Sequence, residues 1–295
     1  SAFPLLFLVF LIKIDVFETE SYKNITYVFL FGIVISFFLC IPYILIREAL
    51  FDNYNTNLFI CFLAVALPEE IIKIIPFLLV LKYRNFVNEP IDFLIYSSAS
   101  ALGFAFYENI NYIIGYSESG NIVAIRSFLP SIKHMIVSSI FSFGIFLYLR
   151  SKKIKYILIG LLLASLVHAV YNTLFISSII LLIILVYYSK MIQSLLNISP
   201  YYDKLKEENL NLAKNFLFFL ILIVLVLSFL FDLLLNGFNS ILADVKSYIY
   251  LLIIPYFIYS IISSRLTLNK GEFILFGKNK NSGFKKEILE IINEF

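Results

Sequence analysis

The sequence predicts an all-α, polytopic transmembrane helix bundle of about nine spans, and two observations carry this prediction. Hydrophobic residues make up 61% of the 295 positions and charged residues only 15%, whereas soluble domains are about half apolar and about a quarter charged. The apolar residues also fall into runs of about 20, the length of a helix that crosses a bilayer. The same composition excludes a disordered chain, a collagen-like chain and a disulfide scaffold.

The expected spans follow one another along residues 1–264, and a charged tail covers 265–295. The stretch Ile154–Tyr188 is too long for one crossing and is divided near Ser177 and Ser178. The spans are about Ala2–Leu11, Ile25–Ile46, Leu58–Leu81, Ile91–Ile114, Phe128–Leu149, two within Ile154–Tyr188, Phe216–Leu235 and Ser247–Ile262.

The distribution of lysine and arginine predicts the orientation of the bundle. With the loop from Arg150 to Lys155 placed in the cytoplasm, 18 of the 23 lysines and arginines fall on the inner side. Leaving Ile154–Tyr188 undivided would move many of these charges outside. We therefore expect an outer N-terminus and a cytoplasmic tail in the cell membrane. The net charge of +3 marks orientation and predicts no nucleic-acid partner.

Ionisable and amide side chains interrupt four successive spans, and such groups are functional candidates because a bilayer penalises them. At about 1.5 Å per helical residue, they lie between about 9 and 16 Å from the outer ends of their spans. One shared layer is what a single active centre would produce. The candidate residues are Glu69, Glu70 and Lys73, then Glu108, then His134, then His168 and Asn172.

Each cluster also has a purely structural interpretation. Lys73 could neutralise a neighbouring carboxylate, since it lies four residues after Glu69 and three after Glu70. His134 could be a helix-contact histidine, and His168 with Asn172 could hydrogen-bond across helices. The small residues from Ser97 to Gly103 predict close helix packing. Lys133 is expected to snorkel to the outer interface.

The candidate set permits peptide hydrolysis, which needs an activated water, an oxyanion donor and an acid for the leaving amine. A glutamate in an apolar layer can shuttle protons. Two histidines and a carboxylate also form a zinc set with one open position. The sequence contains no Gly-x-Ser-x-Gly motif and no pair of membrane aspartates, so it does not support serine or aspartic chemistry.

The run Glu69-Glu70-Ile71-Ile72-Lys73 resembles the Glu-Glu-x-x-Lys motif of the PrsW-type intramembrane proteases. The segments 89–92 and 103–109 resemble the second motif of that family, and His134 and the His168-x-x-x-Asn172 pattern follow in the same order. The resemblance covers about Leu58–Phe175, the expected catalytic core. The family is related to the CAAX-protease and bacteriocin-processing group, which has histidine where this chain has Glu108.

The resemblance implies an endopeptidase that cuts a single-pass membrane protein, such as an anti-sigma factor, near the extracytoplasmic side of the bilayer. We expect all seven candidate residues to take part. Zn²⁺ would be held by Glu108, His134 and His168, with Glu69 as base, Glu70 and Lys73 orienting it and Asn172 donating to the oxyanion. A metal-free glutamate mechanism stays open, as do a proton- or cation-coupled transporter and an inactive scaffold of the same fold.

Overall fold

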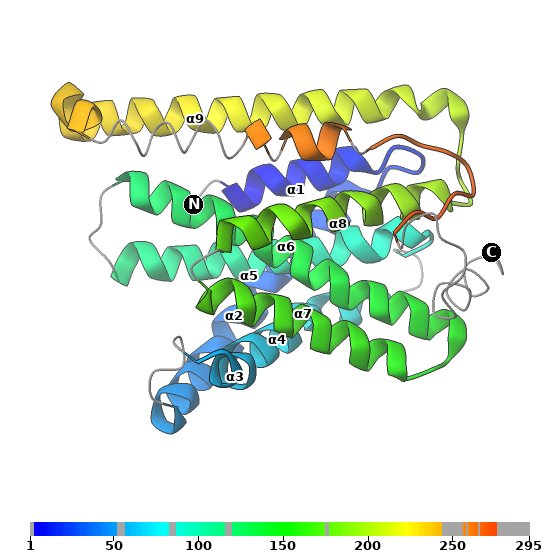
Figure 1. Ribbon diagram of the computed structural model, residues 1–295, viewed down its shortest axis with the longest axis horizontal. Coiled ribbons are helices and arrows are strands. Elements are labelled where there is room, and N and C mark those ends of the chain that lie inside the picture. The colour runs from blue at the N-terminus through cyan, green and yellow to red at the C-terminus, as the bar shows by residue number, and fades with distance from the viewer. Residues whose placement is uncertain are drawn as a thin grey trace.

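A computed structural model describes residues 3–51, 57–82, 87–115, 120–174, 177–243, 256–257, 259–264 and 266–275. In this part of the chain the regular elements are helices (Figure 1). The expectations for a span at Ser247–Ile262 and for most of the tail fall largely outside the described residues. The helices are α1 (Phe3–Ile14), α2 (Tyr22–Leu50), α3 (Leu58–Cys61), a π-helix (Phe62–Ala66), α4 (Leu67–Leu81), α5 (Pro90–Gly115), α6 (Gly120–Ser151), α7 (Lys155–Thr173), α8 (Ser177–Asn197) and α9 (Glu208–Ala243).

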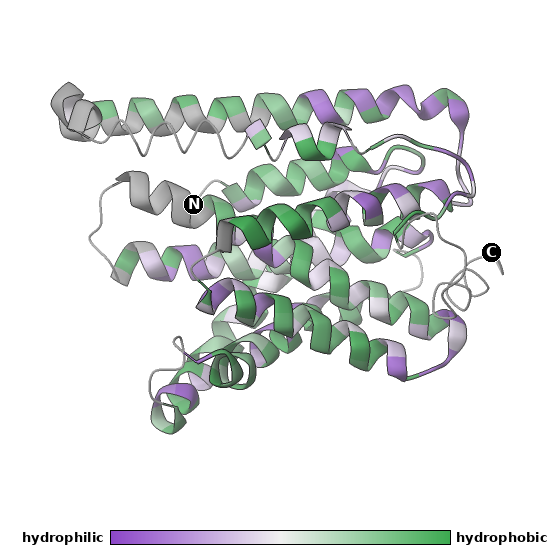
Figure 2. Ribbon diagram, viewed as in Figure 1, coloured by the Kyte–Doolittle hydropathy of each residue, from purple (hydrophilic) through white to green (hydrophobic). Residues whose placement is uncertain are grey.

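The division of the long apolar stretch is confirmed, because α7 ends at Thr173 and α8 begins at Ser177. Among the described residues, four helices are long and apolar enough to cross a membrane. They are Tyr22–Leu50, Phe128–Ser151, Lys155–Thr173 and Ile179–Asn197. The chain is therefore a helical membrane protein, while the count of nine spans stays a prediction. These helices are coloured mostly hydrophobic in Figure 2, and many of their large apolar side chains are exposed, such as Phe38 of α2 and Leu162 of α7.

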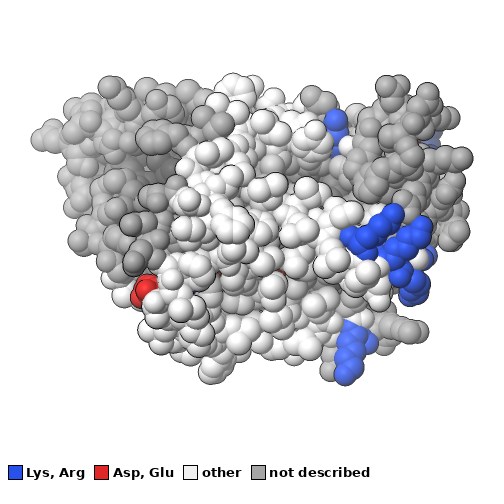
Figure 3. Space-filling model, turned by 60° about the horizontal axis from the view of Figure 1, so that its bottom comes forward, with Lys and Arg blue, Asp and Glu red and all other residues white. Residues whose placement is uncertain are grey.

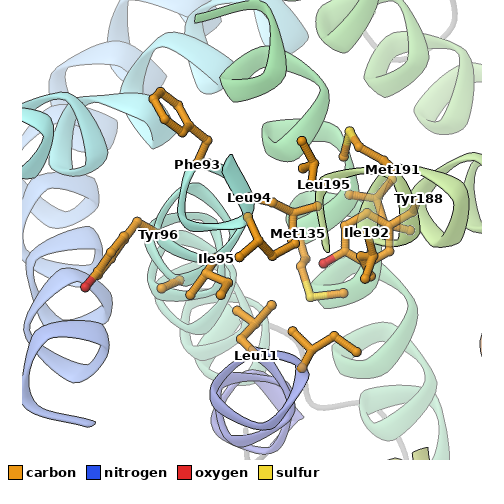
Figure 4. Packing of buried hydrophobic residues seen from close by; sticks show 14 of the residues in the cluster. Leu11, Phe93, Leu94, Ile95, Tyr96, Met135, Tyr188, Met191, Ile192 and Leu195 are labelled. Atoms are coloured by element: carbon orange, nitrogen blue, oxygen red, sulfur yellow. The ribbon is translucent and has the colours of Figure 1, made fainter. Parts of the chain in front are cut away.

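The core lies where α1, α5, α6 and α8 meet. Leu11 of α1, Leu94 of α5, Met135 of α6 and Ile192 of α8 converge there (Figure 4), and each is at most 1% exposed. Burying such side chains is favourable by about 1.5–3 kcal/mol each relative to water. In a bilayer the corresponding gain comes from close van der Waals packing.

Small residues allow α5 to approach its neighbours, as the sequence predicts. A Cβ atom on Gly103 would lie 2.2 Å from the carbonyl oxygen of Phe29 in α2, so the two backbones touch where no side chain could fit. On the side facing α6, Ser97 donates to Ser142 and Ser98 pairs with Ser139, both at 2.8 Å. The position of α5 is thereby fixed against both α2 and α6.

Basic residues gather at one end of the bundle. Arg150, Lys152, Lys153 and Lys155 are exposed around the turn between α6 and α7, and described lysines and arginines cluster at this end of the face drawn in Figure 3. The described tail segment packs near this end, where Asn197 donates to the carbonyl oxygen of Glu272 at 2.8 Å. The charge asymmetry is consistent with a cytoplasmic position for this end.

Candidate active site

A break in helical geometry precedes the first two candidate carboxylates. The π-helix Phe62–Ala66 leads directly into α4, where Pro68 occupies the first turn. Proline has no N–H, so it cannot bond the carbonyl oxygen four residues earlier, on Ala64. The hydroxyl of Tyr43 in α2 donates to that oxygen at 2.7 Å instead. Single π-turns are frequent at functional sites, and this one lies directly before Glu69 and Glu70.

Glu70 is the centre of a fully buried ionic cluster. Its Oε1 lies 2.7 Å from Nζ of Lys73 and 2.8 Å from Nδ1 of His168, and its Oε2 accepts from Ser138 at 3.1 Å. Lys73 also lies 4.5 Å from the ring centre of Phe104. Three helices, α4, α6 and α7, are joined through this one carboxylate. Glu70 and Lys73 thus form the tight pair that the sequence allowed for.

Glu69 is held less firmly and faces the histidines. Its Oε2 lies 3.5 Å from Nζ of Lys73 and 3.6 Å from Nε2 of His168, and it makes no hydrogen bond among the described residues. Glu69, His134 and His168 each offer one ligand atom, and these atoms all lie within 4.8 Å of one another. The two imidazole rings meet edge to face with their centres 5.4 Å apart.

Glu108 reaches the site from α5. Its Oε2 lies 2.8 Å from Nε2 of His134, and its side chain is 26% exposed while the histidine is fully buried. Nδ1 of His134 is buried without a hydrogen-bond partner among the described residues. The histidine pair therefore has a carboxylate at each end. The enclosed Glu69 lies near His168, and the more accessible Glu108 contacts His134.

Lys133 does not snorkel to the interface, and that expectation is wrong. The residue is 4% exposed, and its Nζ lies 2.9 Å from Nε2 of His168 and 3.2 Å from Oδ1 of Asn172. Two hydrogen-bond acceptors inside the bundle hold the ammonium, so it has no need to reach water. Lys133 was not among the residues expected in the site from the sequence. Its place directly before His134 was the available signal.

All seven candidate residues lie in one connected group, together with Lys133. Glu69 and Glu70 contact Lys73 and His168. Lys133 connects His168 to Asn172. The ring of His168 meets that of His134, which reaches Glu108. Neighbouring Asn109 has its amide 3.5 Å from the hydroxyl of Ser131. The shared depth estimated from the sequence is consistent with this convergence of α4, α5, α6 and α7.

The residues present fit a zinc ion. Zinc prefers imidazole and carboxylate ligands in sets of three with one open position. His134 Nδ1 and Glu69 Oε2 are buried atoms without hydrogen bonds in the described part of the chain. His168 Nδ1 meets the Glu70 carboxylate, which is the usual way in which a second carboxylate orients a ligating histidine. Within the described residues, the three-residue group that combines both histidines contains Glu69 rather than Glu108.

Buried histidines and carboxylates among apolar helices are the features of a membrane-embedded hydrolase. Residues 20–196 match the model of the PrsW family of intramembrane metalloproteases, so the chain belongs to this family and is a membrane protease. The description of the family as metalloproteases agrees with the fit of Glu69, His134 and His168 to a metal ion.

Three curated relatives are each named Protease PrsW. The chain is 32% identical to the protein of Geobacillus kaustophilus over 162 residues, which cover 54% of this chain and 69% of the relative. Identity to the Bacillus subtilis protein is 28% over 162 residues, covering 54% and 72%. Identity to the Clostridioides difficile protein is 29% over 137 residues, covering 44% and 57%. No solved structure matches the chain.

Proposed function

We propose that this protease hydrolyses a peptide bond of a single-pass membrane protein, such as an anti-sigma factor, near the extracytoplasmic side of the bilayer. The observation that carries the proposal is the buried group of Glu69, His134 and His168, whose ligand atoms lie within 4.8 Å of one another. The basic end at the turn between α6 and α7 supports a cytoplasmic placement of that end. The site lies towards the other end of α5 and would then be in the outer half.

Zn²⁺, held by the two histidines and one carboxylate, would supply Lewis acidity for the attacking water and the substrate carbonyl. Two arrangements of the carboxylates are compatible with this chemistry. In the one expected from the sequence, Glu108 is the ligand and Glu69 the base. In the one favoured by the distances, Glu69 is the ligand, and Glu108 orients His134 and takes the proton.

The remaining residues have roles in either arrangement. The base removes a proton from the attacking water while the oxygen of that water bonds to the carbonyl carbon of the substrate. It then returns a proton to the leaving amine as the C–N bond breaks. Glu70 holds Nδ1 of His168, and Lys73 balances the Glu70 charge. Asn172, which accepts from Lys133 through Oδ1, would donate an amide N–H to the developing oxyanion.

The test is a cleavage assay on the full chain purified in detergent, with a membrane-anchored peptide as substrate and with or without a strong chelator. Elemental analysis of the same samples counts bound zinc. Glu69→Gln, Glu108→Gln, His134→Ala and His168→Ala should each lose activity. Glu208→Gln, an exposed acid at the start of α9, is the matched control and should behave as the wild type.

The carboxylate variants separate the two arrangements. If Glu69→Gln loses zinc and Glu108→Gln retains it, Glu69 is the ligand, and the reverse result restores the arrangement expected from the sequence. An active wild type that carries far less than one zinc per chain and resists the chelator would exclude the metal mechanism. Full activity in Glu69→Gln and in Glu108→Gln would overturn the proposed site.

A further inference from the structure

A second group of buried carboxylates lies at the opposite end of α5. Asp15 follows α1, Glu89 precedes α5, and Asp92 is in the first turn of α5. One carboxylate oxygen of each lies within 4.8 Å of the others. Glu108 comes 16 residues after Asp92 on the same helix, a rise of about 24 Å. This cluster is therefore a separate site.

The protein anchors each carboxylate through one of its two oxygens. Oδ2 of Asp15 accepts from the backbone N–H of Glu20 at 2.8 Å. Oδ2 of Asp92 accepts from the backbone N–H groups of Asn88 and Glu89, both at 2.8 Å. Oε2 of Glu89 accepts from the hydroxyl of Ser199, in the loop after α8. These bonds fix the direction in which the second oxygens point.

The second oxygens accept no hydrogen bond from an N–H or O–H donor in the described part of the chain, and the carboxyl groups of Asp15 and Glu89 lie within hydrogen-bond reach of each other. These oxygens are Oδ1 of Asp15, Oε1 of Glu89 and Oδ1 of Asp92, and all three are buried. The three residues are 0%, 2% and 0% exposed, and none forms an ion pair with a described lysine or arginine. Buried carboxylates without a cation or donors are strongly unfavourable.

Protons or a metal ion can remove this penalty. Burial, reinforced by the charge of Glu89 and by a hydrogen bond between the two carboxyl groups, raises the pKa of Asp15 to about 10. Burial likewise raises the pKa of Glu89. Without a cation, the cluster would have to carry protons at neutral pH. A divalent cation would instead satisfy the free oxygens while the carboxylates stay ionised.

We propose that Asp15, Glu89 and Asp92 bind one hard divalent cation, Ca²⁺ or Mg²⁺. Both ions take carboxylate oxygens, at about 2.3–2.6 Å for Ca²⁺ and about 2.0–2.1 Å for Mg²⁺. Oxygens within 4.8 Å of one another can share a coordination sphere of this size. Ligand chemistry also separates this site from the histidine-containing one, because carboxylates alone do not favour zinc.

The ion would join three parts of the bundle. Asp15 belongs to the connection after α1, Asp92 and Glu89 to the start of α5, and Ser199 links Glu89 to the connection after α8. Neighbouring Glu20 reinforces this junction, since Tyr96 of α5 donates to its carboxylate at 2.5 Å. The site therefore stabilises the end of the bundle and takes no part in peptide hydrolysis.

The experiment uses the full chain in detergent, stripped with EDTA and then reloaded with zinc before titration with Ca²⁺ or Mg²⁺ alone. Thermal unfolding and elemental analysis are measured on the same samples. The wild type should bind about one Ca²⁺ or Mg²⁺ per chain, and its Tm should rise by about 5 °C at a hundredfold excess over Kd. Glu208→Gln should behave identically.

Asp92→Asn keeps an acceptor for the two backbone N–H groups and removes one ligand charge. It should bind no second ion and should unfold, in EDTA, at or above the temperature of the stripped wild type. Asp15→Asn provides the same comparison if Asp92→Asn does not fold. A wild type that binds neither ion, with Tm unchanged by either, would overturn the proposal in favour of protonated carboxylates. Equal ion binding in wild type and both variants would place the ion elsewhere and also overturn it.

Discussion

Nζ of Lys133 lies 2.9 Å from Nε2 of His168, on the side of the ring away from Glu70. Since the Glu70 carboxylate meets Nδ1, that nitrogen carries the proton and Nε2 has the free lone pair. Lys133 therefore donates to the nitrogen that a metal would use. Ammonium and metal compete for one lone pair, so Lys133 connects the two mechanisms left open by the sequence.

Replacing Lys133 separates these mechanisms. Lys133→Met keeps the length of the side chain and removes its charge and its hydrogen bonds. If zinc binds Nε2 of His168, the zinc affinity of this variant should rise by ~10-fold or more, because a nearby like charge is gone. In a metal-free mechanism, the variant should lose activity while zinc stays absent. Zinc titration and the cleavage assay are measured together, with Lys133→Arg as the charge-preserving comparison.

Glu69 and Glu70 should respond differently to substitution although they are adjacent. Glu70→Ala leaves Lys73 and His168 without their buried partner, and the free energy of unfolding should fall by about 3–5 kcal/mol. Glu69→Gln should leave stability nearly unchanged and lower turnover by ~10²-fold or more. Denaturant unfolding and initial cleavage rates check the pair. Equal loss of stability in both variants would contradict this division of roles.

A side chain larger than hydrogen at Gly32 should force α2 and α5 apart, because their backbones touch at this position. Gly32→Ala would place a Cβ 2.5 Å from the carbonyl oxygen of Ser100, so the helices must separate. We expect a loss of stability of about 1–3 kcal/mol, the usual range for overpacking, together with reduced activity because α5 carries Glu108. Ala49→Val, at an exposed position of the same helix, is the control and should unfold like the wild type.

The orientation of the bundle can be tested by labelling. The native cysteines, Cys40 and Cys61, are 3% and 0% exposed, so they should give little background. Asn111→Cys, exposed near the end of α5, should react with a membrane-impermeant reagent added to intact cells. Lys153→Cys, at the basic turn between α6 and α7, should react only after the membrane is opened. The opposite pattern would invert the topology and the proposed side of cleavage.

The sequence by itself predicted a helical membrane protein, the family, and the residues that converge on one polar layer. These features depend on local properties: apolar run length determines the spans, and charge in a bilayer singles out Glu69, Glu70, Glu108, His134 and His168. Small residues likewise predicted the close packing of α5. The family rests on a resemblance of motifs, and the other inferences need only the residue type, its spacing and the cost of its transfer into lipid.

Only the tertiary structure decided which groups meet. It placed Lys133 on His168 and Asn172, gave Glu70 to Lys73 and His168, and left Oε2 of Glu69 without a hydrogen bond among the described residues. It also brought Asp15 beside Glu89 and Asp92, although more than 70 positions separate them in the chain. Such pairings depend on the rotation and register of whole helices, which backbone contacts such as Gly103 against Phe29 determine and which no single segment encodes.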